Sequence, residues 1–196
     1  LVLRLYDTRD GAVRIGGVDV RELQLDALRA NVRSVTQEVQ LFNASVYDNV
    51  TLFDSSVDES RVRDVLHDVG LDPWFATLPD GLGTVLGAGG VGMSAGEAQL
   101  LALSRVFLAA PAVVVLDEPS SRLDPATEQL VEAATTRLLA HRTAIVIAHR
   151  VAALAAVDDV AVLENGRLIE HGPRAVLAAD PTSAFAQLLT PTESPA

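Results

Sequence analysis

Four aliphatic residues at 113–116 are followed at once by Asp117, Glu118 and Pro119. This run is short enough for a strand and too apolar for a strand with one wet face, so it is typical of a central strand in a parallel sheet. Ligands of such sheets bind just beyond the carboxyl ends of the strands. Two carboxylates there can hold a hard cation and polarise a water; the alternative is that they are solvated acids at a strand end.

The chain on either side of this run alternates strands and helices. Apolar strands are predicted at 32–36, 112–116 and 144–148, and helices at 94–109 and 125–140. Asp124 before Pro125 favours an N-cap followed by proline at the first helical position. Alternation of this kind predicts an α/β sheet with right-handed crossovers.

The segment between residues 38 and 92 has a different character. Apolar residues at helical spacing predict a short helix within 41–53 and an amphipathic helix at 58–69, which Gly70 ends. The glycine-rich stretch 81–92 is expected to be a flexible connector. Elsewhere, Gly16-Gly17 and Asn165-Gly166 predict hairpin turns. Residues 1–6 are expected to be the end of an amphipathic helix.

Composition limits the possible partners. The net charge of −11 disfavours nucleic acid, because binding to its phosphates needs a basic surface. Nucleotides are still allowed, since backbone N–H groups and one divalent cation can hold a few phosphates. No run approaches the roughly 18 apolar residues of a membrane span, so we expect any membrane association to come through a partner.

Several chemistry-bearing residues follow one another in a distinctive order. They are Gln37 at a strand end, Met93 to Glu97 at a helix start, Asp117-Glu118, Ser121 to Asp124, and His149 after an apolar strand. In order and spacing the chain resembles the nucleotide-binding domain of an exporter-type ATP-binding cassette transporter, from just after its phosphate-binding loop to its C-terminus. The resemblance covers essentially the whole chain, and several motifs agree independently.

The resemblance implies a role for each residue at a strand end. Gln37 is similar to the Q-loop glutamine, which bridges the Mg²⁺ shell and the attacking water. Asp117 and Glu118 are similar to the Walker B pair, with Asp117 binding Mg²⁺ through water and Glu118 acting as base or orienter of the hydrolytic water. His149 is similar to the switch histidine that contacts the γ-phosphate.

The helix start resembles the signature motif, usually Leu-Ser-Gly-Gly-Gln. Ser94 and Gly96 match it, whereas Met93, Ala95 and Glu97 depart from it. A helix N-terminus preceded by glycines is an anion site. The spacing of the serine and the glutamate also fits a capping box, so a well-capped helix with no further role is the alternative. The added negative charge and methyl group predict a weaker or slower ATP site.

Two further segments resemble interface regions of the family. Ser121 to Asp124 resembles the D-loop, which crosses the dimer interface, with Arg122 replacing the usual small residue. The N-cap role of Asp124 is equally well supported. Residues 41–42 and 46–50 resemble the exporter segment that lies against the transmembrane partner.

For the whole chain the resemblance implies a P-loop NTPase-like α/β fold, a mixed sheet flanked by helices with an inserted α-helical subdomain. Residues 1–37 and 110–196 are assigned to the ATPase core and 38–109 to the helical subdomain. The implied cofactors are ATP and Mg²⁺. The implied partners are a transmembrane domain and a second nucleotide-binding domain, dimerised head to tail at the cytoplasmic face of the cell membrane to power export.

The phosphate-binding loop of the family, which ends in Lys and Ser or Thr, has no counterpart here. All fifteen basic residues are Arg, and the glycine-rich stretch 81–92 lacks both the Lys and a preceding buried strand. We therefore expect the chain to be a truncated piece of a longer protein, without the Walker A loop and N-terminal strands. Alone it is expected to bind no nucleotide tightly and to be inactive.

Two alternatives belong to other functional classes. One is a non-catalytic module that donates only a signature helix to a partner's ATP site. The other is a DNA-maintenance ATPase of the same superfamily, which would need a long coiled-coil insertion and DNA contacts. The compact segment between Gln37 and Met93 and the negative net charge do not support the second.

Overall fold

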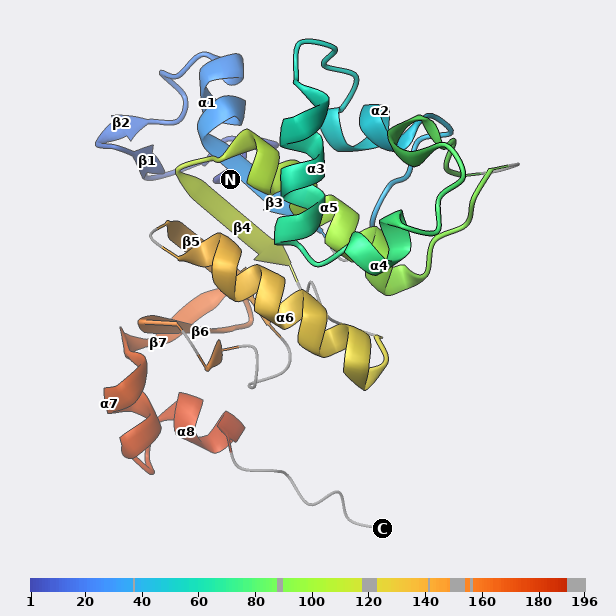
Figure 1. The fold of residues 1–196 in the computed structure, drawn as a ribbon. Helices are drawn as coiled ribbons and strands as arrows, with labels where there is room; N and C mark the ends of the chain where they lie inside the picture. Colours follow the sequence, from blue (N-terminus) through green and yellow to red (C-terminus); the bar gives the residue numbers. More distant parts are fainter. Residues whose placement is uncertain are drawn as a thin grey trace. The chain divides into compact units, whose positions relative to one another are not determined.

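The computed structural model describes residues 1–36, 38–87, 90–117, 123–140, 142–148, 154–155 and 157–189. The chain forms two compact units, Leu1–Ile147 and Ala148–Ala196. The first unit is built on a parallel sheet of β3 (Val32–Val35), β4 (Val113–Asp117) and β5 (Thr143–Ile147), in the order β3-β4-β5 (Figure 1). The predicted α/β fold is confirmed, and its sheet in this unit is parallel and flanked by helices.

The sheet contacts helices from two crossovers. Between β3 and β4 the chain forms α2 (Val46–Thr51), α3 (Glu59–Asp68), α4 (Asp72–Phe75) and α5 (Ala95–Ala109); between β4 and β5 it forms α6 (Pro125–Leu139). Helix α1 (Leu25–Asn31) precedes β3. The main core lies between the sheet, α3, α5 and α6, and it includes Leu66, Leu101 and Leu138.

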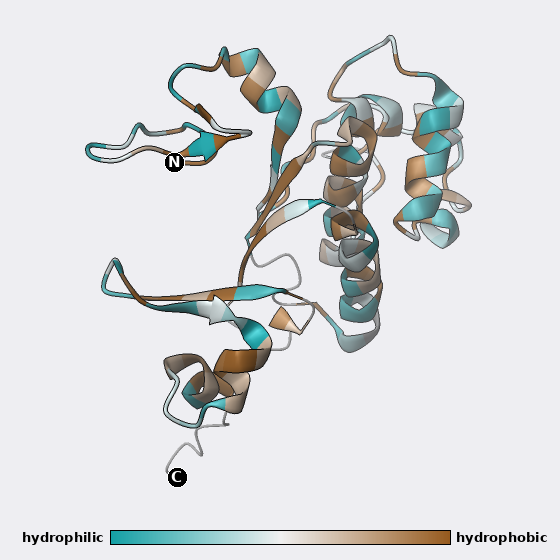
Figure 2. Ribbon diagram, turned by 90° about the vertical axis from the view of Figure 1, so that its left-hand side faces the viewer, coloured by the Kyte–Doolittle hydropathy of each residue, from teal (hydrophilic) through white to brown (hydrophobic). Residues whose placement is uncertain are grey.

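Both faces of β4 are covered, as its unbroken apolar sequence predicts. Val114 and Leu116 are fully buried in the main core. Val113 and Val115 pack on the opposite side against a smaller cluster that contains Leu28. Figure 2 shows the strands of this sheet largely in hydrophobic colours. Strand β4 therefore has both the sequence and the burial that are expected of a central strand.

Strand β5 is as apolar as β4 but is much more exposed. Within the described chain it pairs only with β4, so it lies at an edge of the sheet. Ile145 and Ile147 are 41 % and 46 % exposed, whereas Val146 packs against the main core. A continuous apolar run shows that a strand is suited to burial on both faces, but it does not show whether both faces are covered.

The glycine-rich stretch 81–92 is ordered in its described parts, so the expectation of a flexible connector was wrong there. It contains a 3₁₀ helix, η1 (Gly81–Gly83), and bridges that pair Ser45 with Val85 and Leu86 with Val91. Leu82 and Leu86 are buried in the core. These two leucines anchor the stretch because their apolar burial opposes the conformational freedom of the surrounding glycines.

The N-terminal segment also differs from expectation. Residues 1–6 form turns instead of a helix, and Arg4 has a φ of +51°. A six-residue helical end is too short to offset the cost of helix nucleation. The hairpin that follows is confirmed: β1 (Arg14–Ile15) and β2 (Val18–Asp19) pair antiparallel, and both intervening glycines have positive φ.

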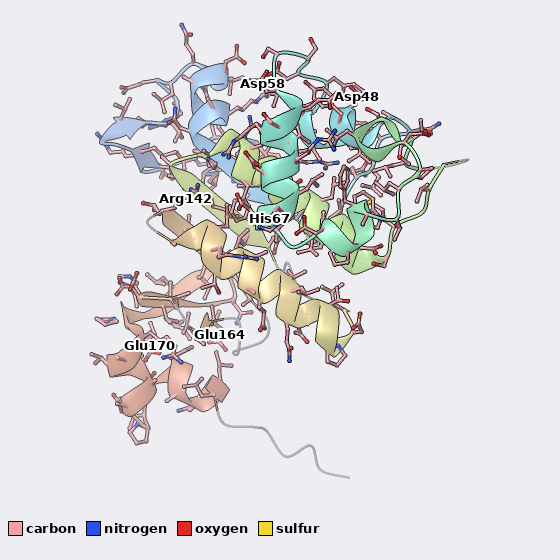
Figure 3. The ribbon with its side chains drawn as sticks, in the orientation of Figure 1. Asp48, Asp58, His67, Arg142, Glu164 and Glu170 are labelled. Atoms are coloured by element: carbon pink, nitrogen blue, oxygen red, sulfur yellow. The ribbon has the colours of Figure 1, made fainter. Side chains whose placement is uncertain are left out.

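The second unit contains the hairpin that Asn165-Gly166 predicts. Strand β6 (Asp159–Glu164) pairs antiparallel with β7 (Arg167–Pro173), and both turn residues have positive φ. Helices α7 (Arg174–Ala179) and α8 (Ala184–Leu189) follow. Glu170 of β7 (labelled in Figure 3) accepts hydrogen bonds at 2.8 Å from the Ser183 hydroxyl and from the Phe185 backbone N–H. This carboxylate therefore fixes the start of α8 on the hairpin.

We expect Glu170→Gln to speed amide hydrogen exchange over residues 184–189 severalfold at neutral pH. The hydrogen bond from the Phe185 backbone N–H, with those from Ser183 and Ala184, lowers the pKa of the Glu170 carboxyl below its ordinary value of 4.5. Stability from this group is therefore present above pH 4.5 and is lost as the pH falls through the lower, folded-state pKa.

The ratio of exchange rates between Glu170→Gln and the wild type, measured at matched pH, should consequently shrink below pH 4.5. Glu164→Gln, which changes an exposed carboxylate on β6 (Figure 3), is the control and should exchange like the wild type. A Glu170→Gln ratio that does not vary with pH would contradict the assigned role of the charge.

Candidate functional site

The carboxyl ends of three parallel strands lie at one edge of the sheet. The register aligns Val35 with Leu116 and Leu116 with Val146, and it pairs Asp117 with Ile147. Ligands of parallel sheets bind at such an edge. Gln37 and Glu118, together with His149, follow these strand ends closely in sequence but lie outside the described residues. Their predicted roles stay predictions.

Asp117 is the predicted site residue that the structure places at this edge. It is the last residue of β4, and its side chain is exposed. Mg²⁺ usually binds one or two protein carboxylates and completes its shell with waters and phosphate oxygens. Among the described residues, no group of three or more histidine or acidic side chains is placed so that it could hold a metal ion. A single accessible carboxylate at a strand end fits the water-shared Mg²⁺ contact that the sequence predicts.

The turn formed by Ser94 to Glu97, here called the signature turn, begins α5. The Ser94 hydroxyl accepts a hydrogen bond from the Glu97 backbone N–H at 3.2 Å. One carboxylate oxygen of Glu97 accepts from the Ser94 backbone N–H at 2.7 Å. The predicted capping box is confirmed. Ala95 is exposed at this turn, whereas Gly96 is buried.

The N-cap of α6 is likewise confirmed. Asp124 accepts a hydrogen bond from the Thr127 backbone N–H at 3.1 Å, which satisfies one donor in the first helical turn. Ser121 and Arg122, the other residues that resemble the D-loop, lie outside the described residues. Both helix starts that the sequence assigns to nucleotide motifs are therefore capped as local spacing predicts.

A cleft of about 380 Å³ lies beside the segment that follows β3. It is lined by the end of β3, by residues 38–40, by the end of α2 and its following loop, and by the second half of α5. Next to it, Phe42 and Phe53 are 41 % and 56 % exposed and form an edge-to-face pair with centroids 5.3 Å apart. The cleft thus has an aromatic neighbourhood that is accessible to a partner.

Arg105 and Asn49 organise this cleft, and neither was singled out from the sequence. Arg105 donates from Nε to the Asn49 carbonyl at 2.8 Å and from Nη2 to the Gln40 carbonyl at 3.0 Å. The Asn49 side chain is fully buried and donates to the carbonyls of Phe42 and Ser45, both at 3.0 Å. A charged residue within the mostly apolar second half of helix 94–109 is the signal that could have revealed Arg105.

The cleft also holds a guanidinium without a carboxylate partner and two buried polar atoms without a hydrogen-bond partner among the described residues. Burial lowers the pKa of the Arg105 guanidinium, and within the described chain it forms no ion pair. Arg33 Nε and Thr51 Oγ1, from residues that also line the cleft, are buried without a hydrogen-bond partner in the described residues. Such groups are costly to leave unpaired, which makes this surface suited to a partner that can satisfy them.

The sequence profile described as ABC transporter matches residues 1–121. This chain belongs to the ABC transporter family. ABC transporter B family member 19 of Arabidopsis thaliana is 36 % identical over 189 residues, which cover 96 % of this chain and 15 % of that protein. The mitochondrial iron-sulfur clusters transporter ATM1 of Saccharomyces cerevisiae is 36 % identical over 192 residues, covering 97 % of this chain and 28 % of the relative.

A multidrug efflux ATP-binding/permease protein of Mycobacterium bovis is 38 % identical over 172 residues, covering 88 % of this chain and 14 % of that protein. The ABC transporter chain described here thus spans less than a third of the length of each of these relatives. The resemblance to a nucleotide-binding domain of exporter type is confirmed at the level of the family. Among the described residues, no helix is both long and apolar enough to cross a membrane.

Proposed function

We propose that this chain is the larger part of a nucleotide-binding domain that hydrolyses ATP to power export of a substrate through a transmembrane partner. One observation carries the proposal: three parallel strands end together where the sequence places Gln37, Asp117-Glu118 and His149, in a chain that belongs to the ABC transporter family. The printed names of the relatives, which include a permease and an iron-sulfur cluster transporter, support a membrane partner.

The proposed chemistry divides among the strand-end residues. Asp117 holds Mg²⁺, which when bound neutralises charge on the phosphates. Glu118 accepts a proton from, or orients, the attacking water, while Gln37 positions that water and His149 contacts the γ-phosphate. Phosphoryl transfer depends mostly on positioning and charge neutralisation, so these groups need little covalent chemistry of their own.

The signature turn serves the partner's site in this proposal. Ser94, Ala95, Gly96 and Glu97 face the ATP of a second nucleotide-binding domain in a head-to-tail dimer, because the dipole and the uncapped backbone N–H groups of a helix N-terminus attract an anion. Asp124 lies near the same interface. The cleft at Arg105 and the aromatic pair beside it are proposed to contact the transmembrane domain, and the chain is proposed to lie at the cytoplasmic face of the cell membrane.

Glu97 is proposed to weaken ATP binding at this composite site. Its carboxylate brings negative charge to the signature turn even while it accepts the Ser94 N–H. Glu97→Gln keeps the capping geometry but removes the charge, so it should lower the KM for ATP in the complete transporter. The Ala95→Gly variant tests the added methyl in the same assay. An unchanged KM and kcat in both variants would disprove the idea.

The proposed function is tested by comparing the complete protein with the chain 1–196. Reconstituted in lipid vesicles with Mg²⁺, the complete transporter should hydrolyse ATP. The chain alone should show no tight ATP binding by calorimetry, because it has no Lys and no phosphate-binding loop. Absence of hydrolysis by the complete protein would refute the ATPase assignment. Sub-millimolar affinity of the chain alone would refute its dependence on that loop.

A further inference from the structure

Gly96 lies in the first turn of α5 and is buried against α6. A Cβ atom built on Gly96 would lie 1.8 Å from Cγ2 of Thr127 and 3.1 Å from its Cβ, and real Cβ atoms essentially never approach another heavy atom more closely than 3.0 Å. The backbone of Gly96 is helical and has no positive φ. The close approach of Thr127 therefore favours glycine at position 96, and a side chain there would force either the Thr127 side chain or one of the two helix starts to move.

Thr127 joins this contact to the cap of its own helix. It is the third residue of α6, and its backbone N–H donates to the Asp124 carboxylate. Helices α5 and α6 lie alongside each other (Figure 1), and Leu103 and Val131 from the two helices share the main core. The signature turn and the capped start of α6 therefore meet through one glycine and one threonine that are 31 positions apart in the sequence.

We propose that Thr127 is a positioning residue that fixes the signature turn relative to the Asp124 cap, so that the two move as one body. The inference rests on the proposed function, in which both segments border an ATP site between two domains. Displacement of groups around a reacting centre by about 1 Å can lower a rate by roughly 100-fold. A shift of the signature turn relative to the Asp124 cap should therefore lower kcat even when the protein stays folded.

A different reason for glycine at position 96 leads to the opposite prediction for variants of Thr127. If position 96 must lack a side chain only because phosphate approaches its backbone, then altering Thr127 cannot restore a Gly96→Ala variant. If Thr127 is the obstacle, shortening it makes room for the new methyl group. Thr127→Val is the matched control, because valine keeps a carbon atom at both γ positions and so preserves the clash.

The experiment measures kcat and KM for ATP in the complete transporter, together with the unfolding temperature of each variant. At a temperature where it remains folded, Gly96→Ala should lower kcat roughly 10- to 100-fold. Adding Thr127→Ala to that variant should raise kcat severalfold, to about the value of Thr127→Ala alone, and adding Thr127→Val should recover none of the loss. Thr127→Ala alone loses part of the contact and should lower kcat less than Gly96→Ala does.

The outcomes separate the possible failures. The inference is overturned if Gly96→Ala lowers kcat and Thr127→Ala does not restore it. The effect of the alanine at position 96 would then not arise from its contact with Thr127. Changes confined to unfolding temperature, with kcat of the folded protein intact, show a structural contact only and also overturn it. If the wild-type transporter hydrolyses no ATP, the proposed function fails, and this inference fails with it.

Discussion

Glu118→Gln in the complete transporter is expected to bind ATP but to lower its turnover by about 100-fold or more, since a positioned general base commonly contributes 10²- to 10⁴-fold. Glutamine keeps the size of the side chain but cannot accept the proton of the attacking water. Binding should be spared because the charge of Asp117, which directly precedes it, is unchanged. The nucleotide-bound variant should accumulate with its two nucleotide-binding domains closed as a dimer, detectable by cross-linking between the domains.

Glu132→Gln provides a matched control for that experiment. Glu132 is an exposed glutamate on α6, away from the strand ends, and its substitution should leave ATP turnover close to the wild-type value. Turnover by Glu118→Gln that equals the control would contradict the assignment of Glu118. Loss of ATP binding in Glu118→Gln would point instead to a role in holding the nucleotide.

Asn49→Ala is expected to lower the free energy of unfolding by about 2–4 kcal/mol, because each buried polar group left without its partner costs about 1–3 kcal/mol. Asn49 is fully buried and accepts the Phe42 backbone N–H at 2.9 Å, in addition to the carbonyl contacts that its amide makes. Alanine would leave the Phe42 backbone N–H without this partner and would remove the side-chain hydrogen bonds to the carbonyls of the 42–45 segment, which keep only their backbone donors. Urea denaturation, followed by Trp74 fluorescence, measures the loss.

Asn31→Ala is the comparison for Asn49→Ala. The exposed Asn31 side chain makes one hydrogen bond, to the Ala27 carbonyl at 2.9 Å, so its removal should cost no more than about 0.5 kcal/mol. Equal losses of unfolding free energy in the two variants would show that the buried hydrogen bonds of Asn49 stabilise the fold no more than the exposed one of Asn31. A large loss for Asn49→Ala alone would establish that the wall of the cleft is part of the stable core.

Local features were the ones that the sequence predicted well. The capping box of Ser94 and Glu97, the Asp124 cap and both hairpin turns each depend on residues within a few positions of one another, so spacing alone specifies them. The apolar run before Asp117 correctly predicted a central strand. The parallel order of the strands followed from the alternation of strands and helices, because such crossovers have few alternatives.

Features that join distant segments were missed. Arg105 meets Asn49 across 56 positions, and Thr127 meets Gly96 across 31, so no local spacing relates them. The glycine content of residues 81–92 predicts flexibility, but Leu82 and Leu86 are buried by tertiary packing, which the local sequence does not reveal. The division into residues 1–37 with 110–196 and residues 38–109 stays a prediction, as do the roles of the strand-end residues.

The exposed edge of β5 has a consequence for handling the protein. Its five residues, Thr143 to Ile147, include no charge and no proline, the two features with which proteins commonly protect an edge strand from pairing with another chain. Within the described chain one edge of this strand has no β-partner, and its two isoleucines are accessible. The chain therefore presents an exposed β-strand edge to which a strand of another chain can pair. We expect this pairing to cause aggregation at high protein concentration, and so to limit the concentration at which the chain stays in solution.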